Sequence, residues 1–450
     1  MKSQNKNIFL LSEGLVGKAL LKLGIPTMVG MMVSSLYNLV DTYFVGTLGT
    51  SQQAAVAAVF PVSLVMLGIG LLFGCGAGSY LSRLLGKGEQ QKADECASTA
   101  LALSVVTAAA LVAVMLLAIN PLLRVLGCTE TMLPYAREYA IPFILGLVIN
   151  VFNSTMSNIA TCEGQPMYSM RSMLLGGIIN IILDPLLILT FHMGVFGAAL
   201  ATLIARLISF ATYLLFLLQK KSCLHFSLKN FYPSKTLLTE IAKIGITTMI
   251  YQVLLSAALS IMNNLAAPFG DAAVAACGIV NRIIMLGIMT IMGFLKGYQA
   301  FVGFNYGAKR YDRVRSATRT ALLWTTGFCA VCSTGMLLYR VPLIRAFNAS
   351  DTQVLSIGAK ALSLNAITFL TFGFQMVYSA KFMGLGKAMD GGLISLGRQG
   401  FFFIPAIYIL TTCFGLKGLI VAQPLADILS MVLVCALALK NRKEEGMLLS

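Results

Sequence analysis

The chain has 450 residues, of which 58% are hydrophobic and 11% are charged, and its formal net charge at pH 7 is +16. Soluble globular domains carry about 25% charged residues, so this composition excludes an ordinary soluble protein. The apolar residues form long runs instead of the alternating pattern of membrane β-strands. The sequence therefore predicts an all-α polytopic membrane protein.

Twelve apolar runs, separated by short polar or Gly/Pro-containing breaks, predict twelve transmembrane helices in two bundles of six. We expect residues 1–219 to form an N-terminal lobe and residues 238–450 a C-terminal lobe, joined by a cytoplasmic linker at 220–237. The predicted spans are 15–44, 53–80, 94–118, 133–160, 167–190, 195–219, 238–266, 272–300, 315–338, 354–382, 389–411 and 416–439.

The lysine and arginine residues favour one side of the predicted bundle. With both termini inside, the basic start of the chain, the lysine-rich linker and the basic tail all fall on the cytoplasmic side. We therefore expect a multi-pass protein of the plasma membrane with both termini cytoplasmic and with membrane lipids around it. Because topology explains most of the positive charge, no nucleic-acid partner is expected.

The two halves of the sequence repeat. Residues 23–28 match residues 244–249 at a shift of 221 positions, and the same shift carries Gly86 onto Gly307. Six helices separate equivalent points, so both copies have the same orientation and are related by an axis along the membrane normal. Two such bundles facing each other are typical of a transporter that works by alternating access.

The run from 173 to 190 contains a single ionisable residue, Asp184. A charged side chain at this depth costs about 2.5–3.5 kcal/mol, so we expect it to face a cavity or a partner. Asn180 shares its helical face, and Pro185 leaves the carbonyl of Ile181 without its usual donor. Such oxygens can bind a proton or a small cation; a polar residue kept for helix–helix hydrogen bonding is the alternative.

Asp41 is the second buried acid and lies near the outer end of the first span. Tyr37 and Asn38 precede it by about one turn and share its face. Pro26 gives the same helix a place to bend. An aspartate that only caps the helix end is the alternative interpretation.

Two more polar residues can reach the same pocket. Thr202 in the sixth span can supply a hydroxyl group, and Asn153 in the fourth span an amide. Both residue types also occur in ordinary helix packing, which is the alternative for each.

The second half has the opposite charges. Its spans contain the basic residues Arg282, Lys296 and Arg398, while Asp427 is its only deeply placed acid. The first half carries its two acids with a single central base, Arg206. An unpaired buried carboxylate is unfavourable, and the three basic residues of its own half are the candidate partners of Asp427. We expect Asp427 to form a structural ion pair with Arg398 in the adjacent span; the alternative is that Asp427 binds the exported cation directly. The unlike charges suggest that only one lobe handles a coupling ion.

Several motifs in a specific order resemble the multidrug and toxic compound extrusion (MATE) family over nearly the whole chain. The first half contains L-G-I-P, V-D-T-Y-F-V-G, G-A-G-S-Y-L-S-R-L-L-G-K-G, N-I-I-L-D-P and V-F-G-A-A-L-A-T; the second contains G-F-N-Y-G-A-K-R and Q-P-L-A-D. The resemblance implies two six-helix lobes and export of mostly cationic, lipophilic compounds against inward H⁺ or Na⁺. It implies no cofactor and no enzymatic activity, and we expect a monomer.

The resemblance also implies a set of site residues. Some family members bind a cation in the first lobe, and the acids that other members carry in the second lobe are missing here. The positions that match the ligands of the first-lobe site, and would hold Na⁺ if that is the coupling ion, are Asp41, Asn180, Asp184 and Thr202. The positions that match polar residues around it are Tyr37, Asn38 and Asn153.

Two other functions compete with drug–cation antiport. A flippase or exporter of a lipid-linked or anionic metabolite would suit the basic residues of the second half. An intramembrane aspartyl protease would use Asp41 and Asp184, but such enzymes carry Gly-x-Gly-Asp, and these acids follow Leu-Val and Ile-Leu.

Overall fold

The computed structural model describes residues 11–347 and 351–447, and within these ranges twelve helices are long and apolar enough to cross a membrane. The predicted all-helical, twelve-span fold is therefore confirmed. The first six spans are α2 (Val16–Gly46), α3 (Thr50–Lys87), α4 (Gln90–Leu117), α6 (Leu133–Cys162), α7 (Pro166–Pro185) with the π-helix η1 (Leu186–Thr190), and α8 (Gly194–Leu218). The second six are α9 (Lys235–Ala266), α10 (Asp271–Gly307), α11 (Tyr311–Leu338), α13 (Thr352–Leu385), α14 (Ala388–Leu396) with the π-helix η4 (Gly397–Phe401) and α15 (Phe403–Phe414), and α16 (Leu416–Met447).

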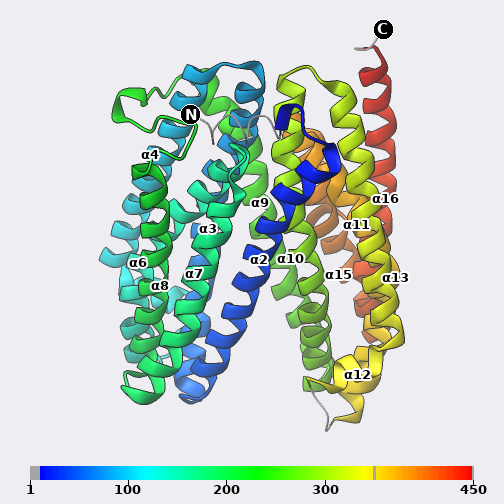
Figure 1. The fold of residues 1–450 in the computed structure, drawn as a ribbon. Coiled ribbons are helices and arrows are strands. Elements are labelled where there is room, and N and C mark those ends of the chain that lie inside the picture. The colour runs from blue at the N-terminus through cyan, green and yellow to red at the C-terminus, as the bar shows by residue number, and fades with distance from the viewer. Residues whose placement is uncertain (1–10, 348–350, 448–450) are drawn as a thin grey trace.

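These helices form two bundles side by side (Figure 1). In the first bundle α3 packs on α4 and α6, and α7 packs on α2 and α8. In the second bundle α13 packs on α10, α11 and α16. We call these bundles the first and second lobe; the limits at residues 219 and 238 as units of motion stay a prediction.

Several helices differ from their predicted limits. α3 and α10 continue to Lys87 and Gly307, seven residues past the predicted ends of their spans. Hydropathy marks the part of a helix that lies in hydrocarbon, whereas intrahelical hydrogen bonds can carry the helix beyond it. Two short helices, α5 (Ile119–Val125) and α12 (Arg340–Arg345), were not predicted. They begin 221 residues apart, so they are equivalent in the two halves.

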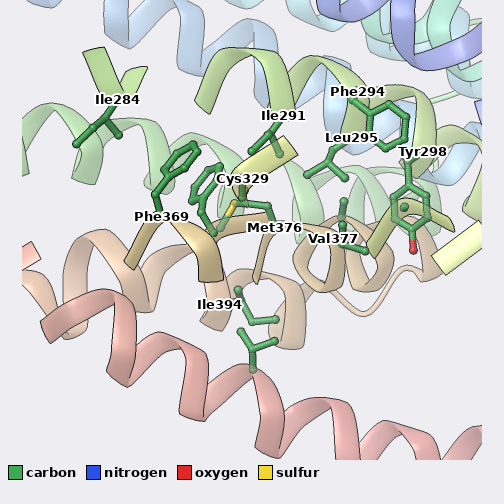
Figure 2. Packing of buried hydrophobic residues seen from close by; sticks show 14 of the residues in the cluster. Ile284, Ile291, Phe294, Leu295, Tyr298, Cys329, Phe369, Met376, Val377 and Ile394 are labelled. Carbon is green, nitrogen blue, oxygen red and sulfur yellow. The ribbon is translucent and has the colours of Figure 1, made fainter. Parts of the chain in front are cut away.

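The second lobe is built on a large apolar core. Figure 2 shows side chains of α10, α11, α13 and α14 meeting there, including Leu295, Cys329, Met376 and Ile394. Leu23 of α2 is part of the same cluster although it belongs to the first lobe. The core of the second lobe therefore extends to the contact between the lobes.

The lobes cross where α3 meets α10. A Cβ atom on Gly86 would lie 2.0 Å from the carbonyl oxygen of Phe304, and a Cβ on Gly307 would lie 2.1 Å from that of Arg83. The shift of 221 positions maps Gly86 onto Gly307 and Arg83 onto Phe304, so one contact occurs twice. The pseudo-two-fold axis therefore passes through this glycine crossing, formed by Gly86 and Gly307.

Further contacts between the lobes lie on the same half of the molecule. Gly245 of α9 approaches α3 so closely that its Cβ would lie 2.1 Å from the carbonyl oxygen of Leu72. Arg83 and Glu240 form a salt bridge of 2.9 Å between α3 and α9. The ribbons meet at the end where α2 begins and α16 ends, and they diverge toward the other end (Figure 1).

The segment between α8 and α9 is attached to the first lobe by Glu163, the residue after α6. Its Oε2 accepts hydrogen bonds from Ser222 Oγ at 2.6 Å and from the backbone nitrogen of Cys223 at 3.0 Å. Burial raises the pKa of Glu163 to about 7, although these hydrogen bonds favour its ionised form. Glu163 thus anchors the predicted linker.

Candidate functional site

The site begins at the C-terminal end of α7. Asp184 is completely buried and Asn180 is 2% exposed. The two residues are four positions apart, so they share a helical face, and Asn180 Nδ2 donates a hydrogen bond of 3.3 Å to Asp184 Oδ1. Directly after Pro185 the helix widens into the π-helix η1. Single π-turns of this kind are frequent at functional sites.

Helix α2 brings the second acid to the same place. Gly177 of α7 has no side chain, and a Cβ there would lie 3.3 Å from Tyr37 Cδ1 and 2.9 Å from Val33 Cγ1. α2 and α7 therefore approach closely at Tyr37, and Asp41 follows one turn further along α2. Asp184 lies about two turns after Gly177 on α7, so the close packing of α2 against α7 brings the two carboxylates into one pocket.

Several oxygen atoms of this pocket have no hydrogen-bond donor in the part of the chain that the structure describes. Acceptor oxygens that are buried away from water are unfavourable unless a donor or a cation satisfies them. Carboxylate and amide oxygens are the ligands that hard cations prefer, and a proton serves the carboxylates equally well. Within the described residues, the buried oxygens here with no hydrogen-bond partner are Asp41 Oδ1, Asn153 Oδ1, Asn180 Oδ1 and Asp184 Oδ2.

Arg206 on α8 forms another side of the pocket. Its Nη1 donates to the carbonyl oxygen of Phe143 at 3.2 Å, and its guanidinium group lies 4.6 Å from the centre of the Phe143 ring. Asn153 Nδ2 donates to the backbone oxygen of Arg206 at 3.0 Å. Gly146 leaves room for the guanidinium group, because a Cβ there would lie 3.1 Å from Nη1. The positive charge of Arg206 interacts with Asp41.

The structure does not unite all the predicted site residues. Asn38 is exposed, and its amide donates to the carbonyl oxygen of Ser34 on its own helix. Thr202 is half-buried and makes no hydrogen bond within the part of the chain that the structure describes. Their roles as ligand or lining residue stay predictions.

Two residues near the acids were not predicted as members of the site. Tyr139 interacts electrostatically with Asp41, Asp184 and Arg206. Its position near the start of its span gave no signal in the sequence. One feature of the sequence could have indicated Arg206: it is the single basic residue in the middle of the first half.

The second lobe contains a paired charge. Arg398 Nε donates to Asp427 Oδ1 at 2.8 Å, and the two residues are 3% and 4% exposed. Gln423 Nε2 donates to the same oxygen at 2.9 Å, and Thr368 Oγ1 donates to Asp427 Oδ2 at 3.2 Å. The expected partner of Asp427 is therefore Arg398 in the structure. That the pair is structural remains a prediction.

A small cavity lies between the lobes. It has a volume of about 20 Å³, which is room for one water molecule. Lys296 makes no ion pair or hydrogen bond within the described residues. The cavity is lined by Gly74, Cys75, Asn158, Thr161 and Cys162 of the first lobe and by Lys296 and Gln299 of α10.

The chain is similar to known proteins over nearly its whole length. The family MatE matches residues 26–186 and residues 246–409, which is one match in each half. The multidrug export protein MepA of Staphylococcus haemolyticus is 27% identical over 444 residues, covering 98% of this chain and 97% of that protein.

Two solved structures have the same fold. One, described as the outward-facing conformation of a multidrug resistance MATE family transporter, has a TM-score of 0.89 at 28% identity and covers 96% of this chain and 99% of its own. The other, a MOP superfamily transporter from Pyrococcus furiosus whose binding pocket is described as of reverse polarity, has a TM-score of 0.91 at 28% identity and covers 99% of both chains. With a family match in each half and a twelve-span fold shared with these structures, the chain belongs to the multidrug and toxic compound extrusion (MATE) family of membrane transporters.

Proposed function

We propose that the protein is a secondary active antiporter that exports organic, mostly cationic, lipophilic compounds in exchange for inward H⁺ or Na⁺. The observation that carries the proposal is the pair of interacting carboxylates, Asp41 and Asp184, with buried oxygens that have no donor. Binding a cation would stabilise the negative charge of such a pocket, and the cation can leave when the compound binds. The names of the similar proteins, a multidrug export protein and a multidrug resistance transporter, support the choice of substrate.

The contacts between the lobes support transport by alternating access. These contacts lie toward the end where α2 begins and α16 ends, while large apolar side chains such as Tyr43 on α2 and Leu286 on α10 are exposed further along. We interpret this state as open to the outside, with the termini in the cytoplasm and the spans in the plasma membrane. A proton or Na⁺ entering at Asp184 would favour opening to the inside. We further propose that the protein acts as a monomer, without a cofactor, surrounded by lipid.

The first test is transport by purified protein in liposomes, with tetraphenylphosphonium as the probe cation. A pH gradient or a Na⁺ gradient is imposed separately, and wild-type protein should move the probe against its concentration with one of them. Asp184→Asn removes the exchanging carboxylate and should abolish gradient-driven transport while the protein still folds.

The matched control is Asp351→Asn. Asp351 caps α13 by accepting hydrogen bonds from the backbone of Gln353 and Val354, and asparagine caps a helix equally well. This variant makes the same chemical change outside the pocket and should transport at the wild-type rate. Wild-type transport by Asp184→Asn, or no gradient-driven movement by the wild type, would contradict the proposal.

A second candidate function has one specific observation in its favour. Lys296 faces the cavity between the lobes without an acidic partner among the described residues, and such a cation suits an anionic or lipid-linked substrate. The Pyrococcus furiosus transporter with a pocket of reverse polarity is similar along its whole length. Competition for tetraphenylphosphonium transport by organic anions decides between the two, because only the second candidate predicts inhibition that Lys296→Gln removes.

A further inference from the structure

The two lobes carry opposite charges at one equivalent position. The shift of 221 residues maps Gly194 onto Gly415 and Gly197 onto Gly418 at the start of the sixth span of each lobe. Continued along the same helices without a gap, it maps Arg206 of α8 onto Asp427 of α16. A base in the first lobe therefore occupies the place of an acid in the second.

Each of these residues faces a charge of the opposite sign in its own lobe. Asp427 forms the 2.8 Å salt bridge with Arg398 and accepts hydrogen bonds from two further side chains. Arg206 interacts with Asp41, but at a distance that is not an ion pair, and Asp41 Oδ1 keeps no hydrogen-bond partner among the described residues. The opposite charges of the second lobe are thus in direct contact as an ion pair, whereas those of the first lobe are not.

Arg206 is held firmly in this place. Its guanidinium group bonds to the backbone oxygen of Phe143 and lies on the ring of the same residue, and Asn153 bonds to its backbone. These contacts fix the positive charge beside Asp41. The charge that acts on Asp184 is that of Asp41, and the side chain that bonds to Asp184 is Asn180.

Building on the proposed antiport, we propose that Arg206 is a permanent counter-charge for Asp41 and makes Asp184 the residue that exchanges the coupling ion. Two carboxylates and one guanidinium group have a net charge of one negative unit. A single monovalent cation, H⁺ or Na⁺, at Asp184 and Asn180 then makes the pocket neutral, whereas a divalent cation or a second proton would leave an uncompensated charge in a low-dielectric site. Arg206 therefore sets the number of coupling ions at one, and it acts through Asp41 as a positioning residue.

The experiment measures how the Kd of purified protein for tetraphenylphosphonium depends on pH at fixed Na⁺, and on Na⁺ at fixed pH. Displacement of one ion changes the Kd about 10-fold for each tenfold change in ion concentration, and displacement of two changes it about 100-fold. Wild type should show the 10-fold dependence on one of the two ions. Arg206→Gln leaves Asp41 without its counter-charge, so the dependence should steepen toward 100-fold.

Neutralising both members of the pair together gives the sharper test. Asp41→Asn alone leaves Arg206 unbalanced and should reduce gradient-driven transport about 10-fold or more. The double variant Asp41→Asn/Arg206→Gln removes both charges together and should regain transport through Asp184, with the 10-fold dependence. Adding Asp184→Asn to the double variant should abolish transport.

Arg206→Lys separates charge from structure. It keeps the positive charge but loses the planar contact with Phe143, so it should retain the 10-fold dependence even if its melting temperature falls. The proposal is overturned if Arg206→Lys behaves as Arg206→Gln, if Arg206→Gln keeps the wild-type dependence, or if the double variant is as inactive as Asp41→Asn. Failure of the antiport itself looks different, because the wild type would then show neither gradient-driven transport nor any ion dependence of the Kd.

Discussion

Two buried aspartates of this protein have opposite surroundings. Asp427 accepts hydrogen bonds at both side-chain oxygens from Arg398, Gln423 and Thr368. Asp184 receives one hydrogen bond, from the neutral Asn180, and its Oδ2 has no donor among the described residues. A satisfied carboxylate is part of the structure, while an unsatisfied one is free to bind an ion. This difference is why we assign exchange to Asp184 and stability to Asp427.

The stability role gives a prediction for Asp427→Ala. Removing the carboxylate leaves Arg398 buried without a counter-charge, which typically costs about 3–5 kcal/mol. The melting temperature of purified protein should fall, while the Kd for tetraphenylphosphonium, measured per folded molecule, should stay near the wild-type value. The double variant Asp427→Leu/Arg398→Met, which removes both charges, should recover most of the lost stability. A stable Asp427→Ala protein that no longer binds the probe would instead place a drug site in the second lobe.

At the scale of elements, irregular turns lie beside the charged residues. The fifth span of each lobe contains a π-helix, η1 directly after Asp184 and η4 around Arg398. α2 contains Pro26, which cannot donate to the carbonyl of Lys22. The hydroxyl of the next residue, Thr27, lies 3.1 Å from the carbonyl oxygen of Leu23 and 2.6 Å from that of Gly293 in the other lobe. The weak point of α2 therefore coincides with its contact to α10.

This coincidence predicts the behaviour of Pro26→Ala. Alanine restores the missing hydrogen bond and resists bending at this point, since proline disfavours a straight helix by about 3 kcal/mol. Transport of tetraphenylphosphonium should slow by roughly fivefold or more, as expected when a conformational step limits turnover. Its Kd should change by less than about twofold, because the drug-binding surface is unaltered. Equal transport rates for variant and wild type would show that α2 does not bend during the cycle.

For the whole molecule, the glycine crossing of α3 and α10 determines how closely the lobes meet. Gly86 and Gly307 each face a backbone carbonyl of the other lobe at a distance that excludes a Cβ atom. Backbone atoms cannot move aside as a flexible side chain can, so a methyl group at either position must push the lobes apart. The end where α2 begins and α16 ends is therefore closed by backbone contact as well as by the Arg83–Glu240 salt bridge.

We expect Gly307→Ala to favour the state in which this end is open. Overpacking of a tight contact costs about 1–3 kcal/mol, enough to shift a two-state equilibrium roughly 5- to 150-fold. Distances between spin labels on the ends of α3 and α10, measured by pulsed electron paramagnetic resonance, should lengthen. Gly327→Ala on α11 is the matched control, because a Cβ there meets nothing within 4 Å. An unchanged distance distribution in Gly307→Ala would show that the crossing does not limit closure.

The sequence predicted the number of helices because each span needs its own run of apolar residues, whatever its neighbours are. Helical spacing also predicted that Asn180 and Asp184 share a face. The cost of an unpaired charge predicted a basic partner for Asp427, but it did not rank Arg398 above Arg282 and Lys296. The sequence did not predict the short helices α5 and α12, because their 7 and 6 residues are too few to form a separate membrane-spanning run. Nor did it place Arg206 and Tyr139 in the pocket, because the sequence of one helix does not determine how closely it packs against the others.

The reciprocal contact at the glycine crossing has a consequence for the origin of the molecule. One surface patch that meets its own copy is the isologous interface of a two-fold symmetric homodimer. A single six-helix ancestor would have dimerised through this patch, with identical residues at the positions now occupied by Arg206 and Asp427. Two arginines or two aspartates there would have given two identical halves. Once two such halves were joined in one chain, each could change independently, which allows a base at one of these positions and an acid at the other.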